Sequence, residues 1–406
     1  MPQSFYIART PELYFGAGGI ARLPELLRAA GWNRVFVITG GGSLRKLPQW
    51  ERLVEALEEN RVFAGDARVS GEPSPELVDE IAATCRMRVA EAIIGIGGGS
   101  ALDTAKATAF AVLHEGSVAD YLEGVGTKSA TGRRLPFVAC PTTAGTGTEA
   151  TWNAVLRRVG PGGFKKSLRH HAFVPDVALI DPELALAVPR HVTAASGLDA
   201  VTQNLEAYVS TGATPYTDAL ALNGLEAAGR SFLRVLENGN DLEARGEMAW
   251  CAHTSGIALA NAGLGLVHGA AGPAGATHDI PHGTACGLLL PAVTSATIAR
   301  LRETAQTQRY EDDADRRRQP APGDALARYA RAGVALTGAD HGSIEKNCDV
   351  LIATLERFLE RAELPSFGAY GFTRDDIRAL SEKAGHKKHP VSFGPREIEE
   401  ILATAL

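Results

Sequence analysis

The feature that most constrains the fold is a short apolar run that meets three glycines and then a helix-forming segment. Residues 92–96 are apolar, residues 97–99 are all glycine, and Ser100 begins a segment of good helix formers that continues to Lys106. The apolar run predicts a buried strand, and Ser100 with Asp103 three residues later predicts a capped helix start. Glycines let a backbone approach a bound group closely, and a helix N-terminus attracts anions. The segment therefore predicts either a phosphate-binding turn or a plain tight connection.

Strands and helices alternate around this turn. Residues 34–39 are mostly β-branched or aromatic, which predicts a strand buried on both faces, and residues 40–43 form a second glycine-rich turn. Helical patterns at residues 50–59 and 75–86, with a short strand near residues 61–63, continue the alternation. Such an order predicts a doubly wound parallel sheet, in which ligands gather at the carboxyl ends of the strands. Both glycine-rich turns follow such ends.

The last predicted strands of the sheet are followed by a change in sequence character near residue 190. A predicted strand at residues 135–140 leads into a loop at 141–151 that is dense in hydroxyls and small residues, and a last strand is predicted at 177–180. The loop could bind phosphate, ribose or amide groups, or be an ordinary polar loop. Beyond about residue 190 the segments are rich in Ala and Leu and helical in period. We therefore predict two domains, an α/β domain over residues 1–185 and an all-helical domain over 186–406.

One segment of the helical half differs from the rest. Residues 306–322 are charged and poor in apolar side chains. This composition predicts an exposed loop, to which we assign no chemistry.

Composition and charge exclude several classes of function. Lys and Arg total 41 against 47 Asp and Glu, a formal net charge of -6, and no basic cluster predicts a nucleic-acid surface. The first residues lack the pattern of a signal peptide, and no apolar run approaches the ~20 residues that span a bilayer, so we expect a cytoplasmic protein. An odd number of widely spread cysteines predicts buried free thiols rather than disulfides or a zinc knuckle. They are Cys85, Cys140, Cys251, Cys286 and Cys348.

Four polar residues of the helical half are candidates for a metal site. Asp199 and Gln203 are four residues apart, which places both oxygens on one face of a helix. His268 and His282 bracket a glycine-rich segment. Two imidazoles, a carboxylate and an amide oxygen suit zinc or iron. The spacing alone is equally compatible with a helix-terminal histidine and a surface or N-cap aspartate that bind no metal.

Five segments together resemble the iron-containing (group III) alcohol dehydrogenase family in their order and spacing. They are residues 97–106, 141–149, 175–183, 197–200 and 265–283. The resemblance runs from about Phe5 to the C-terminus. It implies a dehydroquinate-synthase-like architecture, with a nucleotide-binding α/β domain, a helical domain and a deep cleft between them. It also implies an NAD(P)-dependent dehydrogenase or reductase of small alcohols, aldehydes and related carbonyl compounds that forms dimers or larger homo-oligomers.

The resemblance also implies which residues form the site. The expected cofactor-binding residues are Gly40, Ser43, Gly97, Gly98, Gly99, Ser100, Asp103, Thr142, Thr143, Thr146, Lys165 and Leu179. The expected ligands of a divalent iron or zinc ion are Asp199, Gln203, His268 and His282. The metal would polarise the substrate oxygen while the nicotinamide exchanges hydride.

Three positions depart from the family pattern. Gly40 stands where many members carry an aspartate; with Ser43, Arg45 and Lys46 nearby, we expect NADPH to be accepted and preferred. Gln203 replaces a histidine ligand, which predicts weaker metal binding.

The third departure is at Gly272, where many members carry a histidine near the substrate. His278 is a candidate catalytic proton donor in its place, and a supporting or solvent-facing role is the alternative.

Together these residues predict NADPH-linked reduction of a small aldehyde or ketone, reversible in vitro. Two alternatives belong to other classes. One is a metal-dependent lyase or cyclase of the dehydroquinate synthase kind. The other is a non-catalytic nucleotide-binding protein whose metal site has decayed at Gln203 and Gly272.

Overall fold

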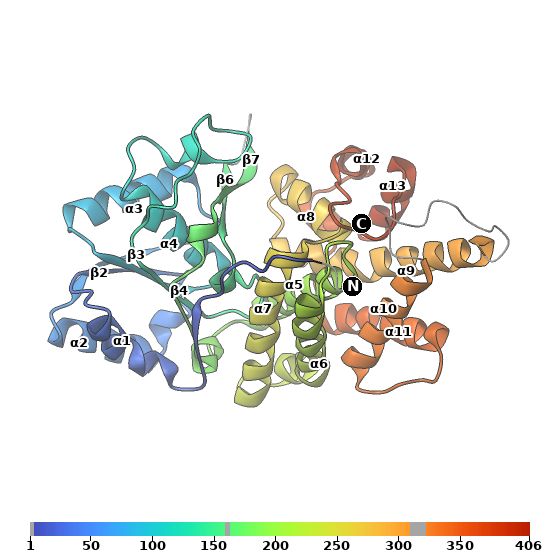
Figure 1. Cartoon of the computed structure of the whole chain (residues 1–406), viewed down its shortest axis with the longest axis horizontal. Coiled ribbons are helices and arrows are strands. Elements are labelled where there is room, and N and C mark those ends of the chain that lie inside the picture. The colour runs from blue at the N-terminus through green and yellow to red at the C-terminus, as the bar shows by residue number, and fades with distance from the viewer. Residues whose placement is uncertain (1–3, 159–162, 309–321) are drawn as a thin grey trace. The chain divides into compact units, whose positions relative to one another are not determined.

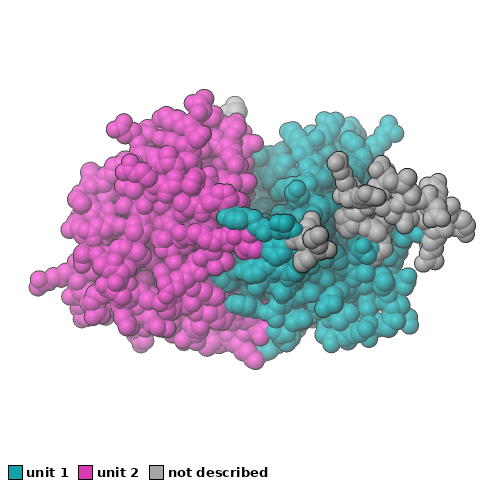
Figure 2. All heavy atoms as spheres, in the orientation of Figure 1, with its two compact units in different colours: residues 1–6, 190–238, 250–406 teal, residues 7–189, 239–249 magenta. Residues whose placement is uncertain are grey.

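The computed structural model describes residues 4–158, 163–308 and 322–406, and these form two compact units (Figure 2). The α/β unit contains residues 7–189 and 239–249, and the helical unit contains residues 1–6, 190–238 and 250–406. The predicted boundary between residues 185 and 186 stays a prediction. The main boundary between the units lies between residues 189 and 190. In addition, residues 1–6 belong to the helical unit and residues 239–249 belong to the α/β unit. Of the loop predicted at 306–322, residues 309–321 lie outside the described residues.

The α/β unit is built on a parallel sheet. Its strands, in spatial order, are β1 (Glu12–Phe15), β8 (Val177–Ile180), β5 (Phe137–Pro141), β4 (Ala92–Gly97), β2 (Val35–Thr39) and β3 (Phe63–Arg68). Every neighbouring pair in this sheet is parallel. The predicted doubly wound sheet is confirmed. A separate antiparallel pair consists of β6 (Asn153–Arg158) and β7 (Phe164–Arg169).

Helices cover both faces of the sheet because its central strands are apolar on both sides (Figure 1). The helices are α1 (Leu23–Ala29), α2 (Pro48–Glu59), α3 (Pro75–Met87) and α4 (Gly99–Ala111). Alternate residues of β2 point to opposite faces. Val37 shares a core with Leu57 of α2, and Phe36 shares another with Ile81 of α3 and Leu102 of α4. Helices on both faces leave the carboxyl ends of the strands as the accessible edge.

Helix α4 begins two residues earlier than the capping pattern predicts. Its N-cap is Gly98, in extended conformation, and Ser100 lies within the first turn. The predicted serine cap is therefore wrong, because the glycine turn itself forms the helix entry without a side chain. Farther along α4, the ammonium of Lys106 is fully buried and donates to the carbonyl oxygens of Thr148 and Asn153. This contact fastens the helix to the loop after β5.

The second unit is helical, as predicted. Its helices are α5 (Arg190–Val209), α6 (Pro215–Glu237), the later part of α7 (Leu242–Ala262), α8 (Leu266–Thr277), α9 (His282–Gln308), α10 (Pro322–Thr337), α11 (Ile344–Ala362), α12 (Arg374–Lys383) and α13 (Pro395–Ala403). Residues 242–249 of α7 belong to the α/β unit. Helix α5 packs against α6 and α9. A buried cluster joins α8, α9, α12 and α13 around Leu266, Leu289, Phe367 and Ile377.

One segment of α9 corrects the prediction that no apolar run approaches membrane-spanning length. Within the described residues, His282–Ala305 is long and apolar enough to cross a bilayer, and the mean hydropathy of its most apolar 18-residue window is 1.3. Of its most apolar window, 72% is buried inside the protein. The core helix of a soluble protein meets the same criteria, and the packing of α9 against α5 and α8 is that of a core helix.

Replacing Gly97 by alanine is expected to destabilise the α/β unit. An added Cβ would lie 2.6 Å from Cβ of Ala101 and 3.0 Å from the backbone nitrogen of Gly40. Overpacking of this kind costs about 1–3 kcal/mol. The melting temperature of Gly97→Ala should therefore fall clearly below that of Gly41→Ala, because a Cβ on Gly41 meets no atom within 4 Å. Equal melting temperatures for the two variants would contradict the close approach at Gly97.

Candidate functional site

Three turns that the sequence predicts as ligand-binding meet at the carboxyl ends of β2, β4 and β5. The backbone nitrogen of Gly40 donates to the carbonyl of Ile96 at 3.1 Å, and that of Thr142 donates to the carbonyl of Gly97 at 2.9 Å. A side chain at Gly97 would clash with its neighbours, so glycine is required for the turns to approach. The structure thus brings the predicted glycine and threonine turns together.

Two threonines of the third turn lie against the start of α4. A Cβ added to Gly98 would sit 3.1 Å from the Oγ1 of Thr143, and one added to Gly99 would sit 2.7 Å from the Cγ2 of Thr146. The N-cap of α4 has no side chain to bond its first N–H groups. Ser100 is half-buried in the same turn. Hydroxyls beside a helix N-terminus can hold a phosphate or pyrophosphate group.

Three predicted cofactor residues lie in other surroundings. The carboxylate of Asp103 is buried and accepts from the backbone nitrogen of Val155 at 3.0 Å, so it joins α4 to β6. Leu179 is fully buried in the sheet core, so its role as a cofactor contact stays a prediction that this burial does not favour. The ammonium of Lys165 lies 2.7 Å from Oε1 of Glu72, in an ion pair whose cation is nearly buried.

Two arginines lie near the turn after β2. The sequence predicted Arg45 there but not Arg68. Ser43 precedes a short 3-10 helix, Leu44–Lys46. The guanidinium of Arg45 pairs with Asp66 of β3. Arg68, at the end of β3, donates to the carbonyl of Gly41. Arg68 was not predicted, because only the pairing of β2 with β3 brings it beside the turn.

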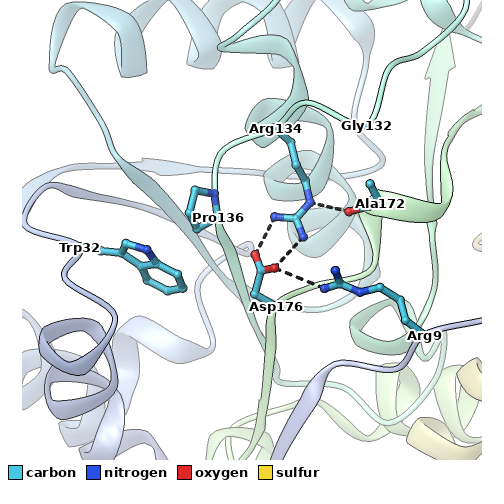
Figure 3. A pocket seen from close by; sticks show the side chains of 7 residues that line it. All are labelled: Arg9, Trp32, Gly132, Arg134, Pro136, Ala172 and Asp176. Carbon is cyan, nitrogen blue, oxygen red and sulfur yellow. Dashed lines mark hydrogen bonds and ion pairs between the residues drawn. The ribbon is translucent and has the colours of Figure 1, made fainter.

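A pocket elsewhere in the α/β unit is lined in part by an ion-pair network (Figure 3). The guanidinium of Arg134 makes two hydrogen bonds to Asp176, at 2.6 and 2.9 Å, and Arg9 lies 3.3 Å from the same carboxylate. Arg134 also donates to the carbonyl of Ala172. These groups satisfy one another and fasten the chain before β5 to the chain before β8. No predicted site residue lines this pocket.

In the helical unit, three predicted metal ligands converge with a residue that was not predicted. Asp199 comes from α5, His268 from α8, and His282 and Cys286 from α9. Their ligand atoms all lie within 4.8 Å of one another. Oδ1 of Asp199 is 3.3 Å from Nε2 of His268 and 3.9 Å from Nε2 of His282. The sulfur of Cys286 is 3.7 Å from each of these nitrogens.

The buried carboxylate of Glu206 orients His268. Its Oε2 lies 2.7 Å from Nδ1 of His268, and its Oε1 accepts from the backbone nitrogen of Val267 at 2.7 Å. A carboxylate only accepts, so Nδ1 carries a proton, which leaves Nε2 as the ring nitrogen that could bind a metal. Burial raises the pKa of Glu206, but its contacts with His268 lower that pKa below the usual range. The carboxylate therefore stays ionised.

The donor set around Asp199 fits a divalent cation. Burial raises the pKa of Asp199, but the interactions with His268 and His282 outweigh this effect and hold the pKa at about 2. Its Oδ1 is buried and accepts no hydrogen bond among the described residues. An ionised carboxylate oxygen, imidazole nitrogens and a sulfur are all ligands that zinc or iron binds in proteins. This donor set therefore suits either metal.

Gln203 contacts this group through Asp199, whereas His278 is not among its side chains. Oε1 of Gln203 accepts from the hydroxyl of Ser255 at 2.8 Å, and the side-chain amide makes a hydrogen bond to Asp199. Nε2 of His278 is 3.6 Å from Oδ1 of Asp376, and its ring packs on Phe372. The catalytic role of His278 stays a prediction that these contacts do not favour.

Comparison with known proteins identifies the family. Residues 10–182 match the family model for iron-containing alcohol dehydrogenase, and residues 193–406 match the model for the C-terminal part of the Fe-containing alcohol dehydrogenase family. The chain belongs to the iron-containing alcohol dehydrogenase family. The predicted resemblance is therefore confirmed.

Relatives of this alcohol dehydrogenase cover its whole length. Long-chain-alcohol dehydrogenase 1 of Geobacillus thermodenitrificans is 37% identical over 98% of this chain and 94% of its own. The NAD-dependent methanol dehydrogenase of Bacillus methanolicus is 28% identical over 98% of both chains. The crystal structure of a 1,3-propanediol oxidoreductase covers 100% of both chains, with 27% identity and a TM-score of 0.84.

The predicted enzyme class follows from this membership. The protein is an NAD(P)-dependent alcohol dehydrogenase, an oxidoreductase that acts on the CH–OH group of alcohols or reduces the corresponding carbonyl compounds. The family uses NAD(H) and iron or another divalent metal.

The contact between Glu206 and His268 predicts that Glu206→Gln lowers metal affinity about 10- to 100-fold, the usual effect of losing such a supporting partner. Glutamine keeps one acceptor oxygen and puts an amide donor in place of the other. The amide NH₂ group then points either at the backbone N–H of Val267 or at Nδ1 of His268. If it points at Nδ1, this nitrogen must accept, and the ring proton moves to Nε2, which faces Asp199.

Metal affinity is measured by competition with a chelator. Glu237→Gln is the control, because this carboxylate is exposed and pairs with Arg361. A Glu206→Gln protein that binds zinc and iron as tightly as the control would contradict the orienting role.

Proposed function

We propose that this alcohol dehydrogenase interconverts a small alcohol and its aldehyde or ketone with NADP(H), and that Asp199, His268 and His282 hold its metal. The observation that carries the proposal is the convergence of these three ligand atoms from three helices, with Oδ1 of Asp199 buried and lacking a hydrogen bond among the described residues. A divalent cation would stabilise this carboxylate further, because a buried charge is costly unless it is paired.

The residues of each unit have separate tasks in this proposal. Thr143, Thr146 and the start of α4 bind the pyrophosphate of the dinucleotide. Glu206 holds the proton on Nδ1 of His268, which keeps Nε2 available. A divalent cation, when bound, supplies Lewis acidity that polarises the substrate oxygen and so favours hydride exchange with the nicotinamide. Asp199 supplies the anionic ligand that would hold this cation. The cleft predicted between the units stays a prediction.

The preference for NADP(H) is argued from the turn after β2. Gly40 offers no carboxylate that would repel a 2′-phosphate. Two guanidinium groups lie near this turn. Arg68 donates to the carbonyl of Gly41, and Arg45 donates to the hydroxyl of Thr39 at 3.3 Å. The nearby carboxylate of Asp66 is already paired with Arg45, which reduces its repulsion of a phosphate.

The remaining features of the proposal concern the setting of the enzyme. We propose a cytoplasmic homodimer or larger homo-oligomer that binds neither nucleic acid nor membranes. The acidic net charge of -6 and the burial of most of the apolar window of α9 support this view.

The proposed function is tested with a panel of substrates. Methanol, 1,3-propanediol, a long-chain alcohol and the matching aldehydes are assayed with NAD(H) and NADP(H), with and without added zinc or iron. Turnover that depends on added metal and favours NADPH supports the proposal. Absence of turnover by metal-loaded protein with every substrate would contradict it.

Asp199→Asn is expected to lower kcat more than about 100-fold, since it removes the anionic ligand and with it several kcal/mol of metal assistance. NADPH affinity, measured by fluorescence, should stay within about twofold of wild type, because Asp199 lies in the helical unit and the glycine turns lie in the α/β unit. Asp349→Asn is the control, an exposed aspartate paired with Arg302. Full activity of Asp199→Asn would contradict its role as a metal ligand.

Gly40→Asp is expected to shift the cofactor preference toward NADH. A Cβ at this position would be 3.6 Å from Cα of Gly97, which is an ordinary contact, so the side chain fits. The added carboxylate would repel a 2′-phosphate and lower the ratio of kcat/KM for NADPH over NADH at least about tenfold. Gly40→Asn has the same size without the charge and should change the ratio much less. An equal shift in both variants would show that size, not charge, decides.

A further inference from the structure

We propose that Cys286 is the fourth protein ligand of the metal, in the place that the family pattern gives to the residue at position 203. The site would then combine one carboxylate, two imidazoles and one thiolate. This inference rests on the proposed metal site of Asp199, His268 and His282, and it concerns a residue that the family pattern does not include.

The helix geometry brings the thiol to the site. Cys286 follows His282 by four residues on α9, so both side chains lie on one face of the helix, one turn apart. The thiol is fully buried, and its sulfur lies 3.7 Å from Nε2 of His268 and 3.7 Å from Nε2 of His282. The sulfur therefore faces both proposed nitrogen ligands at once.

The distances match a tetrahedral site. Zinc bonds of about 2.0–2.1 Å to nitrogen or oxygen and 2.3 Å to sulfur place tetrahedral ligand atoms about 3.3 Å apart for a nitrogen–oxygen pair and about 3.6 Å for a nitrogen–sulfur pair. The observed separations are 3.3 Å from His268 to Asp199 and 3.7 Å from Cys286 to each histidine. The 3.9 Å from His282 to Asp199 requires only a small adjustment.

The amide of Gln203 is held in a different way. Its oxygen accepts from Ser255, and its hydrogen bond to Asp199 turns the amide NH₂ group toward the carboxylate. An NH₂ group has no lone pair to offer a metal. Rotation of the amide by half a turn would present its oxygen instead, which is the competing arrangement for the fourth ligand.

Coordination by Cys286 changes which metals the site prefers. As the metal–sulfur bond forms, the thiol loses its proton to solvent, as coordinating thiols do. A thiolate with two imidazoles favours zinc, iron(II) or cobalt(II) over harder ions such as magnesium or manganese. We therefore expect magnesium and manganese to compete poorly for this site.

The ligand is identified by spectroscopy of the metal-loaded protein rather than by its activity. Wild type, Cys286→Ser and Cys348→Ser are loaded with cobalt(II) for absorption spectra and with zinc for X-ray absorption at the zinc edge. Cys348 is the control, because it is also buried in the helical unit and its thiol donates to the carbonyl of Leu326 instead. Wild type and Cys348→Ser should show a sulfur-to-cobalt charge-transfer band and one zinc–sulfur distance of about 2.3 Å.

Cys286→Ser should lose both signals and bind zinc at least about tenfold more weakly, since even the loss of a supporting partner has that effect. Adding Gln203→His to Cys286→Ser should restore the affinity without the sulfur signals. Gln203→Ala should keep the sulfur signals.

Other results would overturn the proposal, and they separate its failure from that of the proposed function. A zinc site with only nitrogen and oxygen neighbours in wild type, and weaker zinc binding in Gln203→Ala, would assign the fourth position to the glutamine while the metal site itself stands. Failure of wild type to bind either cobalt or zinc would overturn the proposed metal site as well.

Discussion

The polar centre of the helical unit depends on one buried carboxylate. Glu206 bonds the first N–H groups of α8 and the imidazole of His268, so one side chain both completes a helix start and directs a ring nitrogen. The charge is favourable there because a helix N-terminus attracts anions. The contact also requires a glycine, since a Cβ on Gly265 would lie 2.8 Å from Oε1 of Glu206. Residues that bind no substrate thus fix the geometry of those proposed to bind the metal.

The starts of α4 and α8 use the same physics for different purposes. Both helices have a glycine N-cap without a side-chain hydrogen bond. At α8 the N–H groups are bonded by Glu206 from within the unit, which makes that end part of the protein's own core. At α4 the surrounding groups are the hydroxyls of Thr143 and Thr146, which add donors rather than a negative charge. A helix start lined by donors suits an anion that comes from outside, such as a pyrophosphate.

The sequence alone was sufficient for the sheet, the helical unit and the grouping of the glycine turns, because periodicity and glycine position are local signals. For Asp199, His268 and His282 the residue types left a metal site as one of two possibilities, and the family resemblance implied the metal site. Residues whose role arises from tertiary neighbours were missed, namely Glu206, which meets His268 across two helices, and Arg68, which reaches the turn by strand pairing. Cys286 did leave a signal, its four-residue spacing from His282. The loss of the serine cap at Ser100 shows that a capping pattern cannot distinguish a glycine entry from a side-chain cap.

The proposed exchange of an imidazole for a thiolate has a consequence for the electrostatics of the site. A divalent ion with one carboxylate and three neutral imidazoles carries a net charge of about +1, whereas one carboxylate, one thiolate and two imidazoles give a net charge near zero. A neutral centre costs less to bury, which suits the almost complete burial of Asp199, His268 and Cys286. A neutral centre also polarises a substrate oxygen less strongly. A thiolate ligand would therefore bind a soft metal more tightly but lower its Lewis acidity. The dehydrogenase would then depend more on how its residues position the substrate than on the charge of its ion.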